Sequence, residues 1–382
     1  MKRVQEILFR NIWFLLPLFL LTACGDVHRS SSGASQVGSF RPNYARNFRV
    51  ESFDGYKVVE MVNPWDTARL LHRYVLVDRD AELPDGLPEG ELLRVPLQRV
   101  AVYSSVHCGM LEELDRADCI AGVCEPEYIA LDFVQDGLKK GTIVNLGIAV
   151  SPDLERVVAA APEAILVSPF ENAGYGRIEK MGIPIVECAD YMESTPLGRA
   201  EWIRLMGLFF GVENRADSLF GHTVAVYDSL RNLAVKAPIK PTVITERKYG
   251  AAWYVPGGNS YIGVLLRDAG ADYLWHDDTQ TGSVPLSFET VFERGQAADF
   301  WLFKYNAPNE MTYETLQSEY EPYRRFAAFE KRNIFVCNTG TVPYYEEMPL
   351  HPDRILRDLI RIFHPELLPE GKLRYYQKLK DE

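Results

Sequence analysis

The sequence predicts an α/β protein with two lobes, each built on a parallel sheet flanked by helices, which a long helix joins and a small β extension precedes. Three observations support this class. The 382 residues are too many for one ordinary core and suit two. From about residue 99, short apolar strands alternate with helices, and after an interruption the alternation resumes at Pro241. In the interrupting segment, apolar residues recur at the spacing of a helix.

Residues 1–24 have the pattern of a targeting segment. A basic start precedes the apolar run IWFLLPLFLL, which is too short for a comfortable transmembrane helix. The residues LTAC follow and resemble the end of a bacterial lipoprotein signal, which is cut before the cysteine, so that Cys24 would carry a lipid. An ordinary secretory signal with an incidental cysteine is the alternative. We therefore expect a periplasmic protein anchored to a membrane by this lipid, with a flexible tether over residues 25–45.

Composition narrows the classes of partner. The formal net charge is −12, which argues against nucleic acid, because nucleic-acid binding calls for basic stripes. The chain has six cysteines, and lipidation of Cys24 would leave five, an odd number that makes a poor disulfide framework. A pair between Cys119 and Cys124 stays open, but for most of these cysteines we expect small buried apolar side chains.

The rest of the chain divides into four predicted segments. Residues 46–98 have β-rich runs, with a hairpin turn at Asp54-Gly55, and form the β extension. The other segments are an N-terminal α/β lobe (99–194), bridging helices (195–237) and a C-terminal α/β lobe (238–382). In the bridge, apolar residues recur at helical spacing at Leu219, Val226, Leu230 and Leu233. About 22 helical residues there would reach about 33 Å, enough to cross two small lobes.

Each lobe contains one predicted helix with a glutamate in its first turn. The stretch SPDLERVV, residues 151–158, predicts a helix capped by Ser151 with Pro152 at its first position and Glu155 in its first turn. The stretch LSFETVFERG sets Glu289 in the matching place. Each helix leads into a buried strand, so the two stretches form a weak internal repeat. An acidic residue in a first turn is common, because it interacts favourably with the helix dipole.

The order of these features resembles a known family. The lipoprotein signal, the two lobes with a long joining helix, and the runs LGIAVSPDLERVVAAAPEAILV, GGNSYIGVLLRDAGADYL and HPDRILRDLIRIFHPEL are similar to those of periplasmic substrate-binding proteins for iron-siderophore, cobalamin and haem import. The resemblance covers roughly residues 99 to 370 and rests on many weak matches. It implies Rossmann-like lobes, a monomer, and a ligand held between the lobes and delivered to an ATP-driven permease.

The resemblance also implies a role for the paired glutamates. In this family an exposed glutamate on each lobe contacts arginines of the two permease subunits, and Glu155 and Glu289 fall at the matching positions. Two carboxylates on rigid helices suit bidentate contacts with arginine. We therefore expect Glu155 and Glu289 to dock the protein on a permease dimer and its ATPase.

The ligand is expected at loops that follow the strands. Aromatic residues there suit a large, semi-apolar ligand, and basic residues suit an anionic one. His107, just past the first strand, is a candidate axial ligand for haem iron or cobalt, or a hydrogen-bond donor. The full set of predicted cleft residues is Ser105, His107, Phe170, Glu171, Tyr175, Tyr191, Arg247, Trp253, Lys304 and Tyr305.

Other functions fit the sequence less well. We expect no catalytic residues and no intrinsic cofactor, since phosphate-loop, serine-elbow and dinucleotide patterns are absent. A bare-metal site is not expected, because the seven histidines are dispersed. The ligand is expected to be a metal chelate, with a ferric siderophore and cobalamin ranked level and haem behind them. A scaffold lipoprotein or a periplasmic enzyme without a transporter remains the alternative.

Overall fold

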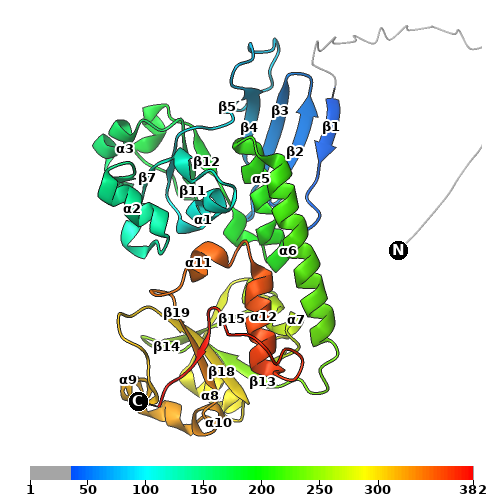
Figure 1. The fold of residues 1–382 in the computed structure, drawn as a ribbon, viewed down its shortest axis with the longest axis vertical. Helices are drawn as coiled ribbons and strands as arrows, with labels where there is room; N and C mark the ends of the chain where they lie inside the picture. Colours follow the sequence, from blue (N-terminus) through cyan, green and yellow to red (C-terminus); the bar gives the residue numbers. More distant parts are fainter. Residues whose placement is uncertain (1–35, 382) are drawn as a thin grey trace, which may run out of the picture. The chain divides into compact units, whose positions relative to one another are not determined.

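The computed structural model describes residues 36–381. The predicted signal segment, Cys24 and the first part of the predicted tether lie outside these residues. Within the described part, no helix combines the length and the apolar character that crossing a membrane requires. The fold class is α/β, as predicted, and the described residues form two mainly parallel five-stranded sheets, a largely antiparallel five-stranded sheet and two small antiparallel sheets (Figure 1).

The β extension is a five-stranded sheet at the start of the described chain. Its strands β1 (Gln36–Phe40), β2 (Phe48–Phe53), β3 (Tyr56–Val62), β4 (Leu70–Asp78) and β5 (Glu91–Val95) lie side by side in chain order. The predicted turn at Asp54-Gly55 joins β2 to β3, and Gly55 has a φ of 83°, which glycine adopts without strain. The prediction of a flexible tether up to residue 45 is wrong at its end, because β1 pairs with β2.

Two buried glutamates hold the segment between β1 and β2. The Glu201 carboxylate accepts the backbone N–H groups of Asn43, Tyr44 and Ala45 at 2.7–3.0 Å. Glu193 accepts those of Arg46 and Asn47, both at 2.9 Å. Both carboxylates are almost fully buried, so these charge-assisted bonds offset much of the cost of removing them from water. We call this arrangement the N-terminal clamp.

The N-lobe is built on a parallel sheet with the order β12-β11-β6-β7-β8. Its strands are β6 (Val100–Val102), β7 (Ile120–Val123), β8 (Val144–Asn145), β11 (Ala164–Val167) and β12 (Ile185–Glu187), and its main helices are α1 (Ser105–Glu113), α2 (Asp132–Lys140) and α3 (Leu154–Ala160). The predicted start of α3 is shifted: Ser151–Pro152 forms a short strand, β10, which pairs with β9 (Gly147–Ile148), and Asp153 is the cap. Asp153 caps because its side chain accepts the N–H groups of Glu155 and Arg156.

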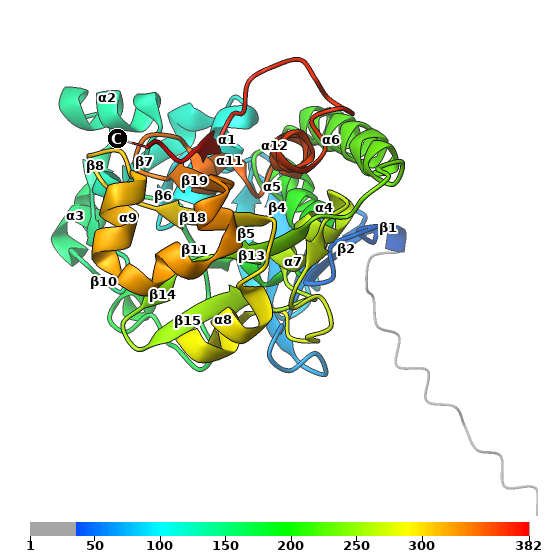
Figure 2. The same ribbon diagram turned by 90° about the horizontal axis from the view of Figure 1, so that it is seen from below.

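The bridge consists of α4 (Pro196–Ala200), α5 (Trp202–Phe209) and α6 (Glu213–Ala234). Thr195 caps α4 by accepting the N–H of Gly198 at 3.1 Å. The 22 residues of α6 match the predicted length, but its buried face is offset from the predicted stripe and carries Ala216, Phe220, Thr223, Tyr227, Leu230 and Ala234. This helix packs on α5 and on α12 (Pro352–Phe363), as Figures 1 and 2 both show.

The C-lobe has a second sheet with the order β16-β13-β18-β19-β20, parallel except for β20. Its strands are β13 (Thr242–Thr245), β16 (Asp272–Tyr273), β18 (Phe300–Tyr305), β19 (Ile334–Asn338) and β20 (Gln377–Lys378). A small antiparallel sheet of β14 (Lys248–Tyr249), β15 (Ala252–Pro256) and β17 (Ser283–Leu286) lies beside it. Besides α12, the C-lobe contains the helices α7 (Tyr261–Asp268), α8 (Phe288–Gly295), α9 (Tyr313–Glu319), α10 (Ala327–Glu330) and α11 (Tyr344–Glu347).

The cysteines within the described residues are buried and unpaired. They are Cys108, Cys119, Cys124, Cys188 and Cys337. The prediction of small buried side chains is therefore confirmed, and the Cys119–Cys124 disulfide does not form.

Candidate ligand-binding site

Two pockets open at the carboxyl ends of the two parallel sheets, where such folds bind ligands. The N-lobe pocket, about 480 Å³, takes residues that follow β6, β7 and β11, among them Tyr103, Glu125 and Ser168. The C-lobe pocket, about 670 Å³, takes Glu246, which follows β13, and Lys304 of β18. Each has the size of a small-molecule site.

The C-lobe pocket has more basic than acidic side chains. Arg199, Arg247, Lys248 and Lys304 line it, and Glu246 is the carboxylate among its lining residues. Glu246 pairs with Lys304, and Arg247 pairs with Glu319 outside the pocket. Within the described chain, Arg199 and Lys248 make no ion pair with a carboxylate; they bond to backbone carbonyls of Tyr191 and Gly250. The pocket therefore favours an anionic ligand.

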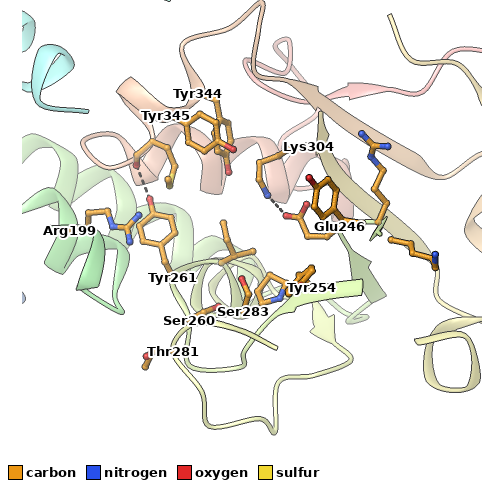
Figure 3. A pocket seen from close by; sticks show the side chains of 17 residues that line it. Arg199, Glu246, Tyr254, Ser260, Tyr261, Thr281, Ser283, Lys304, Tyr344 and Tyr345 are labelled. Atoms are coloured by element: carbon orange, nitrogen blue, oxygen red, sulfur yellow. Dashed lines mark hydrogen bonds and ion pairs between the residues drawn. The ribbon is translucent and has the colours of Figure 1, made fainter. Parts of the chain in front are cut away.

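The Lys304–Glu246 pair lies inside this pocket, as Figure 3 shows. Burial works against the charge of Lys304, but the neighbouring Glu246 carboxylate outweighs it and raises the pKa of Lys304 above its usual value. Lys304 is therefore charged at neutral pH. Because its side chain lines the pocket, it can also bind an anionic ligand there.

Glu246 adopts a left-handed backbone conformation with a φ of 61°. Its N–H donates to Leu302 O at 2.8 Å, and its carbonyl accepts the indole N–H of Trp301 at 2.7 Å. Such a conformation costs about 1–3 kcal/mol for a residue with a side chain and concentrates at functional sites. Sequence reasoning missed Glu246, although it directly follows the strand TVIT at the start of a predicted cleft loop.

Tyrosines form much of the remaining wall of the C-lobe pocket. Tyr254, on β15, lies beside Ser283, and Tyr345, on α11, lies across the pocket from them (Figure 3). Tyr249 is 82% exposed, which leaves its ring available for a ligand. Tyr261 is buried, donates its hydroxyl to Met348 O at 2.8 Å and stacks under Arg199 at 4.6 Å. These rings and the basic groups together suit a flat or aromatic anion.

The N-lobe pocket is more apolar. Phe170 is 61% exposed and Val150 is 85% exposed, and both line it. Tyr175 also lines it and donates its hydroxyl to Glu187 at 2.8 Å. Tyr191 stands behind Phe170, with ring centroids 6.2 Å apart. Phe170 and Tyr175 thus lie where a ligand can reach them, and their role in binding stays a prediction.

Three predicted cleft residues point into the protein core instead. His107 is fully buried, with Nε2 3.0 Å from Asp190 Oδ1. Trp253 is fully buried and donates its indole N–H to Thr245 O at 2.9 Å. The hydroxyl of Tyr305 accepts the N–H of Met311 in the C-lobe core. These predictions need correction, because position after or on a strand does not decide which way a side chain points.

Two other predicted cleft residues line neither pocket. Ser105 is the first residue of α1 and half-buried, and Glu171 is exposed. Across residues 36–381, no group of three or more His, Cys, Asp or Glu side chains is placed to hold a metal ion.

The two paired glutamates occupy equivalent positions in their helices. Glu155 is the second residue of α3 and Glu289 the second residue of α8, and both are exposed. Ser287 caps α8 as Asp153 caps α3. A hydrogen bond from its own backbone N–H and one from Ser287 lower the pKa of Glu289. The lowered pKa favours the ionised form of the Glu289 carboxylate, and both glutamates are exposed at the starts of capped helices.

Helix α11 connects the C-lobe pocket to the N-lobe. Tyr344 and Tyr345 face the pocket, while the carboxylate of the next residue, Glu346, accepts the N–H of Ala130 in the N-lobe at 3.0 Å. Gly109 of α1 lies against the backbone of Glu346, since a Cβ there would sit 2.6 Å from the Glu346 carbonyl oxygen. A side chain at position 109 would therefore push the lobes apart.

Acid should weaken the anchoring of α11 through Glu347. Burial opposes its charge, but hydrogen bonds from Arg374 and Tyr375 outweigh it and lower the pKa of Glu347 to about 2. A lowered carboxylate pKa contributes stability that is complete above the ordinary value near 4.5 and disappears as pH falls towards 2. We expect Glu347→Gln to remove on the order of 2–3 kcal/mol at pH 7.

Chemical denaturation at several pH values checks this prediction. The variant and the parent should converge in unfolding free energy as pH falls from 4.5 to 2. Glu370→Gln, at an exposed position for which no side-chain bond is described, is the control and should follow the parent throughout. A constant gap between parent and Glu347→Gln across this range would contradict the assignment.

Comparisons with known proteins agree with this architecture. An uncharacterised lipoprotein of Methanocaldococcus jannaschii is 26% identical over 365 residues, which cover 89% of this chain and 85% of that one. An ABC-type Fe³⁺-hydroxamate transport protein from Saccharomonospora viridis has a TM-score of 0.53 at 16% identity, covering 72% of this chain and 94% of its own. IsdE of Staphylococcus aureus, solved with haem, has a TM-score of 0.52 at 17% identity, covering 70% and 98%.

At these identities the solved structures establish the fold alone. The profile of the family described as periplasmic binding protein matches residues 100–339, which span both lobes and the bridge. The protein therefore belongs to the periplasmic binding protein family, in its helical-backbone type.

Proposed function

We propose that this protein is the substrate-binding component of an ABC importer and captures an anionic metal chelate, a ferric siderophore or a ligand like it. The observation that carries the proposal is the C-lobe pocket, where four basic side chains and several tyrosines face one carboxylate. Ferric complexes of catecholate and carboxylate siderophores carry net negative charge, and catecholates add aromatic rings, so these complexes match the basic and tyrosine side chains. The solved structure from an Fe³⁺-hydroxamate transport system supports ferric siderophores as the broader class, whereas the basic pocket favours the anionic members of that class.

Haem is the second candidate, because the two pockets differ in character. The exposed Phe170 and Val150 of the N-lobe pocket suit an apolar macrocycle, and the basic C-lobe pocket suits its propionates. His107 is not available as an axial ligand, since it is buried against Asp190. Cobalamin is a further alternative, but no feature of the two pockets favours it over the other ligands.

Delivery completes the proposed function. Lipid on Cys24 would anchor the monomer in the periplasm, and Glu155 and Glu289 would contact the two permease subunits. Their shared position, second in a capped helix on each lobe, supports this role, because each carboxylate is held in place and exposed.

A binding panel tests the proposal. The full-length protein is titrated calorimetrically with ferric siderophores, haem, cobalamin and molybdate, and its visible spectrum is recorded. We expect one-to-one binding of a ferric siderophore, weakened by salt because the site is basic. Haem binding would favour the second candidate. Binding of cobalamin alone would keep a metal chelate as the ligand but contradict the ferric siderophore. Binding of molybdate alone, a bare oxyanion, would contradict a metal chelate altogether, and no binding at all would favour a scaffold lipoprotein.

A further inference from the structure

A third pocket lies away from the carboxyl ends of the sheets. It has a volume of about 440 Å³, and its walls come from residues 42–46, which overlap the N-terminal clamp, and from the start of α4, the last turns of α6 and the second half of α7. It is separate from the C-lobe pocket, because α4 and α7 stand between the two. Leu197 and Val264 line this pocket, whereas Arg199 and Tyr261 of the same helices line the C-lobe pocket. We call it the junction pocket.

Three arginines from three different segments meet in the junction pocket: Arg46, Arg231 and Arg267. Arg231 pairs with Asp228 at 2.9 Å. Arg46 and Arg267 make no ion pair with a carboxylate among residues 36–381. The chain as a whole has a net charge of −12, so its general field repels anions and this local concentration of positive charge differs from its surroundings.

One acidic side chain of this pocket is already engaged. The carboxylate of Asp268 accepts the hydroxyl hydrogen of Tyr227 at 2.7 Å and forms no ion pair among the described residues, although Arg267 and Arg231 are near enough to act on its charge. Arg46 and Arg267 therefore remain without a carboxylate ion-pair partner, and Arg231 shares its charge with Asp228. Guanidinium groups bind phosphate oxygens in bidentate fashion, which makes a phosphate ester or a condensed phosphate the matching chemistry.

The walls of the junction pocket are fixed before any ligand arrives. The backbone N–H groups of Tyr44 and Arg46 are held by Glu201 and Glu193 in the N-terminal clamp. Arg231 and Arg267 stand on helices. The entropy lost on binding would therefore come mainly from the arginine side chains and not from the backbone. A smaller entropy loss leaves more of the interaction free energy to appear as affinity.

We propose that the junction pocket is a second binding site, separate from the ligand cleft, for a phosphate-bearing anion, taken either from solution or from a membrane lipid headgroup. Arg46 and Arg267 supply its free charges and Arg231 a third contact. The site does not depend on the identity of the imported ligand.

Pyrophosphate binding by the full-length protein in detergent tests the proposal. We expect saturable binding that weakens with salt, and a loss of at least about tenfold in affinity in the double variant Arg46→Ala/Arg267→Ala. Arg69→Ala is the matched control, since Arg69 is exposed and has no carboxylate partner among the described residues. Both arginines of the double variant are exposed, so its thermal unfolding should match that of the parent.

A second arm separates the two sources of phosphate. The full-length protein and the double variant are compared on phosphatidylcholine vesicles with and without phosphatidylglycerol. A gain from phosphatidylglycerol that the double variant loses assigns the site to a lipid headgroup; pyrophosphate binding without that gain assigns it to a soluble anion. The proposal is overturned if neither probe binds, or if the double variant binds both as the parent does.

Discussion

Reversing the charge of Glu155 and Glu289 together is expected to abolish stimulation of the permease ATPase and to leave ligand affinity unchanged. Each glutamate is the second residue of a capped helix and is exposed, so it can reach an arginine of a partner without rearrangement. Glu155→Lys and Glu289→Lys would turn both contacts into like-charge repulsion, which costs several kcal/mol. Neither residue lines a pocket, so ligand binding should not change.

Vesicles that contain the cognate permease and ATPase provide the measurement. Glu314→Lys is a close control, because Glu314 is also the exposed second residue of a helix, α9, whose cap is Thr312. It should stimulate like the parent. Each single reversal should retain part of the stimulation, since one contact remains. Full stimulation by the double reversal would exclude docking through these residues.

Replacing Lys304 with methionine should weaken binding of an anionic ligand by roughly two orders of magnitude. A hydrogen bond to a charged group contributes about 1.5–3 kcal/mol, which corresponds to roughly 10- to 150-fold in affinity. The variant also leaves Glu246 without its partner, and this carboxylate would then repel the ligand. The effect should therefore reach the upper part of that range.

A double variant separates the two contributions. Lys304→Met/Glu246→Gln removes the repelling charge as well, so it should recover part of the lost affinity. Lys331→Met, at an exposed position of the C-lobe that lines neither pocket, is the control and should bind like the parent. Calorimetric titration with the ligand found in the panel gives all four affinities. Equal affinity of the parent and Lys304→Met would show that the ligand does not contact Lys304.

The fold was predictable because its elements repeat simple patterns. The strand–helix alternation in each lobe and the apolar spacing in α6 are local features of sequence, and they predicted parallel sheets and a 22-residue helix. Strand β1 was missed because QVGSF ends the polar, Ser- and Gly-rich stretch GDVHRSSSGASQVGSF, whose composition predicts a flexible tether. The last five residues of that stretch form a strand because they pair antiparallel with β2, and composition alone does not reveal this pairing.

Side-chain direction was the part of the site that the sequence did not disclose. His107 follows the first strand closely, as a cleft residue should, but it belongs to the first turn of α1, and the helical rotation turns it towards Asp190. Phe170 and Tyr175 lie in a loop and face the N-lobe pocket. Glu246 was not among the predicted site residues. Its placement depends on a left-handed backbone conformation, and a glutamate in the sequence gives no sign of that conformation.

The N-terminal clamp bears on where the folded part of the chain begins. Strand β1 pairs with β2, and the carboxylates of Glu193 and Glu201 accept the backbone N–H groups of residues 43–47. A chain shortened to begin at β2 would leave these two buried carboxylates without five backbone donors, a loss that trimming a flexible leader would not cause. Residues 36–47 therefore belong to the folded body of the protein.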